Sequence, residues 1–146
     1  MNKEEFLKEY EKVRVKKIED MPIEEIDDLL QKSIEVKLSP IRPIPYKGEI
    51  DEVVVYEYPE LTADCPMTRI QDLYTIRITY IPDKYVPELK SLKMYFLDYK
   101  NLPISHENLC AKIYKEFKEA VKPKKLKVEL EVAVRGGIKT TIRYEK

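Results

Sequence analysis

Two side chains seven residues apart have the chemistry of a covalent catalyst. Cys65 lies in a polar segment, whereas a structural cysteine usually lies within an apolar run. A thiolate is a strong nucleophile, and a carboxyl group held beside it and away from water can keep a proton for a substrate nitrogen. We therefore interpret Cys65 as a candidate nucleophile and Asp72 as a candidate proton donor. An inert thiol and a cap at the start of a strand are the structural alternatives.

A second polar pair, His106 and Glu107, follows the candidate helix N-cap Ser105. His106 is the single histidine of the chain. A carboxylate can accept two hydrogen bonds from the ring N–H and the amino group of a guanine-like base, and that geometry is selective. Alternatively, Glu107 serves only the positive end of the helix dipole. Cys110 lies on the apolar side of the same stretch, and we expect it to be packed.

A third set of polar residues could meet a phosphate-bearing cofactor. Lys90 and Lys93 bracket Ser91, which places two ammonium groups and a hydroxyl close together. Arg135 adds a bidentate donor, and Gly136 permits close backbone approach. The alternative is the polar edge of a strand. The sequence has no GxGxxG and no Walker A motif, so any nucleotide site is neither of the Rossmann nor of the P-loop kind.

Composition bounds the class of protein. The chain has 146 residues, enough for one domain with a real core, and 27 basic residues balance 27 acidic ones. A neutral chain has no global field that would attract nucleic acid or an anionic membrane. No stretch approaches the roughly 20 apolar residues of a membrane span, and no signal peptide is evident, so we expect a cytoplasmic protein. Two cysteines and one histidine leave no familiar zinc spacing, and we predict no metal site.

The first 45 residues are predicted to form a helical extension and a linker. Apolar residues recur at helical intervals over 3–17, and a second helical stretch covers 21–30. A short strand is expected over 34–38, and the prolines of 39–46 predict an extended linker. We therefore divide the chain into an N-terminal extension with a Pro-rich linker (1–45) and a main domain (46–146).

The main domain alternates between strand patterns and one strong helical pattern. Strands are expected over 51–58, 73–81, 92–99, 126–134 and 138–144, with Pro59 ending the first and a loop over 61–71. An amphipathic helix follows Ser105 and stops before Pro123. This order predicts an α+β fold, an antiparallel sheet with helices on one face. Such a sheet has exposed edges, and self-association is a natural way to cover them.

Taken together, in this order and spacing, the motifs resemble the 7-cyano-7-deazaguanine reductase (QueF) family of queuosine biosynthesis. The resemblance covers roughly residues 51–138. Its marks are Cys65-Pro66 with Thr68 and Asp72, Tyr80-Ile-Pro-Asp83, Glu88-Leu-Lys-Ser-Leu-Lys93 with Tyr95, His106-Glu107, and Arg135-Gly-Gly-Ile138.

The resemblance implies the tunnelling fold shared with GTP cyclohydrolase, in which subunits join their sheets into oligomeric barrels with active sites between subunits. It implies that Cys65 attacks the nitrile carbon of a deazaguanine to form a thioimide, and that Asp72 protonates the nitrogen. Two hydrides from two NADPH then give the aminomethyl product. The implied substrate-binding residues are Pro87, Glu88, Leu89, His106 and Glu107, and the implied NADPH-binding residues are Lys90, Ser91, Lys93, Arg135 and Gly136.

The sequence also departs from the family pattern. The loop reads Thr-Arg-Ile-Gln-Asp where the family often has Thr-Gly-Gln-Pro-Asp, and Met94 replaces the usual Leu or Tyr. Residues 1–45 match no motif of the family.

Other functions remain open at this stage. A related archaeal amidinotransferase uses the same Cys and Asp to add ammonia to the nitrile on tRNA. It is expected to lack the Lys90–Lys93 signature and to need a tRNA-binding surface. GTP cyclohydrolase activity would require zinc ligands. A non-catalytic scaffold subunit would have no use for Cys65 together with Asp72.

Overall fold

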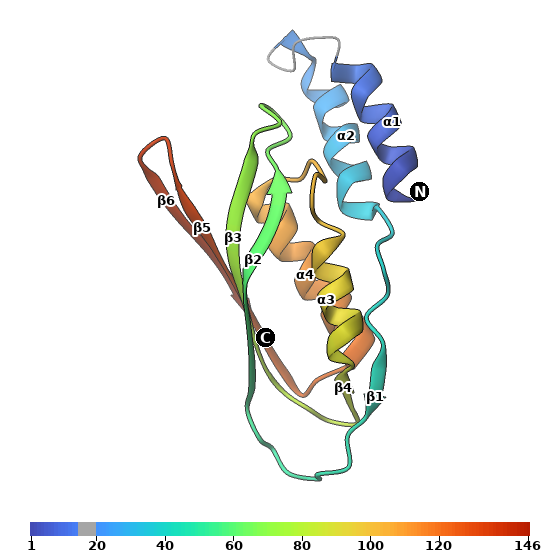
Figure 1. Ribbon diagram of the computed structural model, residues 1–146, viewed down its shortest axis with the longest axis vertical. Coiled ribbons are helices and arrows are strands. Elements are labelled where there is room, and N and C mark those ends of the chain that lie inside the picture. Colours follow the sequence, from blue (N-terminus) through green and yellow to red (C-terminus); the bar gives the residue numbers. More distant parts are fainter. Residues whose placement is uncertain (15–19) are drawn as a thin grey trace.

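A four-stranded antiparallel sheet with helices on one face forms the centre of the molecule (Figure 1). The computed structural model describes residues 1–14 and 20–146. The strand order in the sheet is β2-β3-β5-β6, and β1 and β4 form a separate two-stranded sheet. The elements in chain order are α1 (Lys3–Arg14), α2 (Ile23–Glu35), β1 (Pro43–Pro45), β2 (Val54–Asp64), β3 (Gln71–Ile81), β4 (Tyr85–Pro87), α3 (Leu89–Leu97), α4 (His106–Val121), β5 (Lys125–Arg135) and β6 (Ile138–Glu145).

The central strands follow the alternation expected from the sequence. In β3, Tyr74, Ile76, Ile78 and Tyr80 are buried, while the residues between them face the other side of the sheet. β5 alternates in the same way and pairs antiparallel with β3. Because successive side chains in a strand point to opposite faces, one face of the sheet carries the core. The predicted antiparallel sheet with helices on one face is confirmed.

Helix α4 lies across the buried face of the sheet and confirms the helix predicted after Ser105. The Ser105 hydroxyl accepts a hydrogen bond from the backbone N–H of Asn108, 3.4 Å away, as an N-cap does. Leu109, Ile113 and Phe117 are fully buried. The helix therefore places His106 and Glu107 in its first turn.

The strand predicted over 92–99 is wrong, because Leu89–Leu97 forms helix α3. Leu92, Tyr95 and Phe96 are buried at the i, i+3 and i+4 positions of one helical face. The Glu88 carboxylate accepts hydrogen bonds from the backbone N–H groups of Lys90 and Ser91, which caps the helix. Aromatic content suggested a strand, but helical spacing and the cap decide the local structure.

Two predicted boundaries near the N-terminus also change. The strand expected over 34–38 is wrong, because helix α2 continues to Glu35 and Lys37 forms only an isolated bridge with Asn2. Within the predicted linker, β1 pairs with β4. The expected end of the first helix, at residue 17, lies outside the described residues; α1 is described as far as Arg14.

The strand expected to end at Pro59 continues to Asp64 as β2. The β2–β3 register shifts between Tyr58 and Leu61, so Pro59 falls where the regular ladder is interrupted and no N–H is required of it. The predicted loop over 61–71 therefore shrinks to residues 65–70.

Helices α1 and α2 pack on the same core as the sheet. Phe6, Tyr10 and Leu29 are buried in a continuous hydrophobic cluster with the residues of β3, β5 and α4. The ammonium group of Lys112 in α4 is buried and donates to the carbonyls of Ile34 and Val36, each 2.7 Å away. These bonds satisfy carbonyl groups at the end of α2 with a cation, which suits the helix dipole.

Candidate active site

The Cys65 loop is a tight turn between two paired strands. Asp64 at the end of β2 pairs with Gln71 at the start of β3. The Cys65 N–H donates to the Ile70 carbonyl at 2.9 Å, and the Arg69 N–H donates to the Cys65 carbonyl at 2.8 Å. These bonds close the loop on itself and fix the position of the thiol relative to Asp72, the second residue of β3.

The environment of Cys65 favours its thiolate. Burial raises the pKa of the thiol, but other groups act in the opposite direction and outweigh it. They are the Thr68 hydroxyl, the backbone N–H groups of Thr68 and Met67, and the positive charge of Arg135. The net shift of the Cys65 pKa is downward, so more thiolate is present near neutral pH than for an ordinary cysteine.

Asp72 is buried and bound to Arg135 of β5. The Arg135 Nη1 atom lies 2.5 Å from Asp72 Oδ1, and its Nη2 atom lies 2.8 Å from the Thr68 hydroxyl. The pairing with Asp72 raises the pKa of the Arg135 guanidinium, which also contacts Cys65. The buried Oδ2 of Asp72 has no hydrogen-bond partner among the described residues. Arg135 thus links the thiol and the carboxyl group and leaves one carboxyl oxygen available.

His106 joins this cluster from the start of α4. Its Nδ1 atom lies 2.8 Å from the Tyr74 hydroxyl and 3.9 Å from Asp72 Oδ2. Burial, with the nearby charge of Asp72, raises the pKa of Tyr74 far above the ordinary tyrosine value. Tyr74 is therefore a neutral phenol that can donate to the imidazole. We name the Cys65, Asp72, Tyr74, His106 and Arg135 group the thiol cluster.

Glu107, the next residue, is exposed and borders a cavity of about 810 Å³ between α4 and β6. Its carboxylate is therefore accessible to a ligand, although no residue of the thiol cluster lines this cavity. Cys110 is buried on the same helix, and burial raises its pKa to about 11. The expectation that Cys110 is a packed cysteine is confirmed.

The residues expected to bind cofactor lie mostly elsewhere. The N-terminus of α3 adjoins β4, whereas the Cys65 loop lies at the opposite end of the sheet, near α1 and α2 (Figure 1). Leu89, Lys90 and Lys93 are exposed there. The Ser91 hydroxyl donates to the Glu88 carbonyl at 2.7 Å and accepts from the Arg42 N–H at 2.9 Å. Pro87 is buried at the end of β4. We name this group, residues 87–93, the α3 cap region.

Arg135 and Gly136 belong to the hairpin that joins β5 and β6. Gly136 and Gly137 have φ angles of 58° and 80°, which glycine adopts without steric cost and which hairpin turns of this kind require. The turn geometry alone explains both glycines. Within one chain, Arg135 contacts the thiol cluster and not the α3 cap region.

The model of the family described as "QueF-like protein" matches residues 71–146. A further match extends over more of the chain: the NADPH-dependent 7-cyano-7-deazaguanine reductase of Elusimicrobium minutum is 43% identical over 103 residues, which are 69% of this chain and 76% of that one. The chain belongs to the QueF-like family.

Other members of the QueF-like family support the assignment. The protein of Chloroherpeton thalassium, also named NADPH-dependent 7-cyano-7-deazaguanine reductase, is 48% identical over 84 residues, which are 58% of this chain and 72% of the relative. A crystal structure of archaeosine synthase QueF-Like in the apo form matches with a TM-score of 0.62 and 23% identity, covering 66% of this chain and 95% of that one. This likeness confirms the tunnelling fold.

Sequence reasoning missed several polar contacts of this QueF-like chain. Tyr74 lies within the strand expected over 73–81, and only the structure shows that its hydroxyl lies at His106. Arg135 and Asp72 are 63 residues apart, and they meet because β5 lies next to β3 in the sheet. No local sequence pattern predicts the Tyr74–His106 contact or the Arg135–Asp72 contact.

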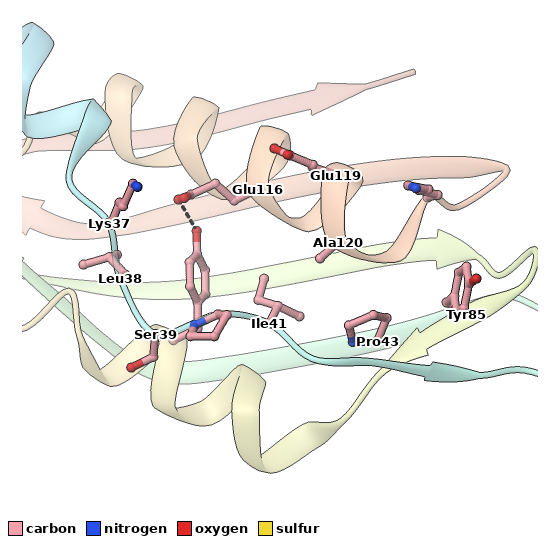
Figure 2. A pocket seen from close by; sticks show the side chains of 12 residues that line it. Lys37, Leu38, Ser39, Ile41, Pro43, Tyr85, Glu116, Glu119 and Ala120 are labelled. Carbon is pink, nitrogen blue, oxygen red and sulfur yellow. Dashed lines mark hydrogen bonds between the residues drawn. The ribbon is translucent and has the colours of Figure 1, made fainter. Parts of the chain in front are cut away.

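A second cavity, of about 610 Å³, lies between the 37–43 segment, α3 and α4 (Figure 2). At its wall the Tyr95 hydroxyl donates to Glu116, 2.9 Å away (Figure 2). Lys112, which does not line the cavity, forms an ion pair with the same carboxylate at 3.1 Å. These groups satisfy one another, and the predicted site residues lie outside the lining. We therefore interpret the cavity as a structural gap where the N-terminal segment packs on the rest of the domain, and not as a binding site.

Two further features are absent from residues 1–14 and 20–146, the part of the chain that the structure describes. No group of three or more His, Cys, Asp or Glu side chains in this part of the chain could hold a metal ion. None of the helices described there is both long and apolar enough to cross a lipid bilayer.

Proposed function

We propose that this chain is a cytoplasmic NADPH-dependent nitrile reductase that converts 7-cyano-7-deazaguanine to 7-aminomethyl-7-deazaguanine, in tRNA queuosine biosynthesis. The observation that carries the proposal is the thiol cluster, in which a thiol of lowered pKa and a buried carboxyl group share Arg135. The names of the relatives, each an NADPH-dependent 7-cyano-7-deazaguanine reductase, supply the substrate and the reductant. In this proposal residues 46–146 are the catalytic domain and residues 1–45 its helical extension.

The first step is addition of the Cys65 thiolate to the nitrile carbon. A C–S bond forms, one π bond of the nitrile breaks, and the nitrogen takes a proton from Asp72, which gives a thioimide. A nitrile is a weak electrophile, so a sulfur nucleophile with local proton delivery splits one hard step into easier ones. Asp72 Oδ2 is the carboxyl oxygen proposed for this transfer, because it accepts no hydrogen bond from the described residues while Arg135 holds Oδ1.

Recognition of the base falls to the first turn of α4 in this proposal. The exposed Glu107 carboxylate accepts the two donors of a guanine-like edge. His106 is oriented by Tyr74 and lies next to Asp72, so it keeps the heterocycle close to the proton donor. Pro87, Glu88 and Leu89 complete the pocket from the α3 cap region.

The donors of the α3 cap region suit the phosphates of a dinucleotide. Lys90 and Lys93 are exposed and form no ion pair within the described part of the chain, and they lie in the first turns of a helix, where anions are favoured. Ser91 is already engaged by the backbone, so the two lysines are the main candidates in this region. When bound, each of two successive NADPH molecules would supply one of the two hydrides of the reduction.

Within one chain, the thiol cluster and the α3 cap region lie at opposite ends of the sheet (Figure 1). The complete site is therefore proposed to form between two copies of the chain. The sheet has two unpaired edge strands, β2 and β6, that allow sheets of different copies to join. Exposed apolar residues on or beside these strands, among them Val55 and Tyr144, support burial in a homo-oligomer.

The test mixes the protein with 7-cyano-7-deazaguanine and NADPH and measures the decrease in NADPH absorbance at constant protein concentration. Wild type is expected to oxidise two NADPH per nitrile and to release the aminomethyl product. Cys65→Ala is expected to oxidise none, and Cys110→Ala, which removes the packed cysteine, is the matched control and stays active. Absence of NADPH oxidation by wild type contradicts the reductase.

The fold match to an archaeosine synthase supports a second candidate, addition of ammonia to the nitrile carried on tRNA. Both reactions would use Cys65 and Asp72 in the same first step. They differ in the second substrate, so nitrile-bearing tRNA with ammonia, in the absence of NADPH, distinguishes them. The Lys90–Lys93 signature and the balanced charge of the chain favour the reductase.

A further inference from the structure

The N-terminal helix α1 contacts the Cys65 loop directly. The buried Tyr10 hydroxyl donates a hydrogen bond to the Pro66 carbonyl, 56 residues away in the sequence. One residue further along the helix, Glu11 accepts a hydrogen bond from Arg69 Nη1 at 2.6 Å. The extension therefore contacts two residues, Pro66 and Arg69, of the turn that carries the candidate nucleophile.

The Tyr10 bond acts on a peptide unit that also faces the sulfur. The Pro66 carbonyl and the Met67 N–H belong to the same planar peptide group. That N–H is one of the donors that lower the pKa of the Cys65 thiol. A hydrogen bond at the carbonyl fixes the orientation of the peptide and polarises it, which strengthens the N–H as a donor. Tyr10 is thus connected to the sulfur through a single rigid unit.

Arg69 provides a second attachment at an unusual backbone position. Its φ angle is 61°, in the left-handed region that is sterically unfavourable for residues other than glycine. Its guanidinium lies 4.9 Å from the centre of the Tyr10 ring, and its Nε lies 3.4 Å from Asp64 Oδ2. Contacts with α1 and with the end of β2 therefore hold the strained residue in place.

We propose that α1 is a positioning element for Cys65, in which Tyr10 orients the Pro66–Met67 peptide toward the sulfur and Glu11 anchors the loop through Arg69. This inference rests on the proposed function for its catalytic meaning, but the positioning is a property of the folded chain alone. Tyr10, Glu11 and Arg69 act through Cys65 and touch no reacting atom.

The charged and titratable groups around the Cys65 loop are Arg69 in the loop itself, Asp64 at the end of β2, Glu11 on α1, and four groups on three other elements. Arg135 lies on β5, Asp72 and Tyr74 lie on β3, and His106 lies on α4. A change at Tyr10 leaves all four in place. Its effect on the ionisation of Cys65 therefore reports the peptide and not these neighbours.

Tyr10→Phe in the full chain is the direct test, read out as the rate of iodoacetamide alkylation of Cys65 against pH, with the Cys65 peptide quantified by mass spectrometry. The variant keeps the ring and loses only the donor. We expect alkylation of the variant to be about threefold to tenfold slower than that of wild type at pH 7. At pH 10, where the Cys65 thiol is ionised in both proteins, the two rates are expected to be equal. Ser33→Ala is the matched control, because it removes another hydroxyl of the extension from a prolyl carbonyl, that of Pro103, and leaves the Cys65 loop contacts intact.

A rate at pH 7 equal to wild type, or a change equally large at pH 10, overturns the proposal. The second form would indicate altered access and not altered ionisation. Alkylation needs neither NADPH nor a nitrile, so a chain with no reductase activity but with the expected pH profile would contradict the proposed function and leave the positioning role standing.

The Glu11 anchor is tested separately by hydrogen exchange of the 65–70 segment. Glu11→Gln is expected to speed exchange in this loop about twofold to fivefold, since a partly exposed ion pair to Arg69 is lost. Glu9→Gln removes the same charge from the same helix, where the partner is Lys32, and is expected to leave the loop at the wild-type rate. Equal exchange in Glu11→Gln and wild type would contradict the anchor.

Discussion

The two ends of the molecule are built in different ways. At the thiol cluster, side chains from β3, β5 and α4 converge on Asp72 and satisfy most of one another's polar groups. At the α3 cap region, Glu88 and Ser91 bind their own helix and the neighbouring backbone, while the two lysines point to solvent. One end is organised by tertiary contacts before any ligand arrives, and the other offers mainly charge.

This difference separates the two tasks of the proposed reaction. Covalent chemistry requires a thiol, an acid and a base-recognition group at fixed distances, which side chains held by mutual hydrogen bonds provide. A phosphate-bearing cofactor requires cations that can approach and release it, which exposed lysines at a helix start provide. Changes at the thiol cluster are therefore expected to affect the rate of chemistry, and changes at the α3 cap region to affect cofactor affinity.

The largest effect is expected from Asp72→Asn. The amide keeps the shape of the side chain but holds no transferable proton, so kcat is expected to fall by about 100-fold or more. Steady-state NADPH oxidation with 7-cyano-7-deazaguanine measures this. Asp51→Asn, which alters an exposed acid paired with Lys124, is the control and should retain wild-type kcat. If Asp72→Asn kept a kcat within about twofold of the wild-type value, Asp72 would not be the proton donor.

A moderate effect is expected from Lys90→Ala. Loss of one ammonium group from the α3 cap region is expected to raise the KM for NADPH about tenfold while kcat changes little, because the interaction is made equally before and during the reaction. Lys100→Ala, at an exposed lysine beyond α3, provides the comparison. If kcat fell and the KM for NADPH stayed constant, the assignment of this region to cofactor binding would be wrong.

The smallest expected effect is partial recovery of activity when two inactive variants are mixed. Cys65→Ala lacks the nucleophile but has an intact α3 cap region. A Lys90→Glu, Lys93→Glu double variant keeps the nucleophile but lacks both lysines of the α3 cap region. If sites form between copies, mixed oligomers contain some sites with both halves intact. Unfolding and refolding the two together should restore part of the NADPH oxidation. No recovery in oligomers shown to be mixed would place both halves in one chain.

Much of the fold was accessible from the sequence, because its signals are local. The alternation in β3 and β5 and the N-cap Ser105 each act within a few residues, and the structure confirms all three. The segment 92–99 is the exception, because it forms part of helix α3 and not the expected strand. Its helical form depends on the cap from Glu88 and on burial of Leu92, Tyr95 and Phe96 against the rest of the core.

The candidate site could be predicted only in part. Residue type and spacing indicated Cys65, Asp72, His106 and Glu107, but not their partners. The Arg135–Asp72 and Tyr10–Pro66 contacts join segments 63 and 56 residues apart. Such contacts follow from strand order and helix packing. The contact between the first helix and the Cys65 loop could therefore not be predicted from the sequence.

The most direct test of the central claim is the mass of the protein after incubation with 7-cyano-7-deazaguanine in the absence of NADPH. The account predicts an increase equal to the mass of one substrate molecule per chain, located on the Cys65 peptide and lost when NADPH is added. Cys65→Ala should show no increase. An unmodified wild-type protein, or an adduct on Cys110, would contradict the assignment of Cys65 as the nucleophile.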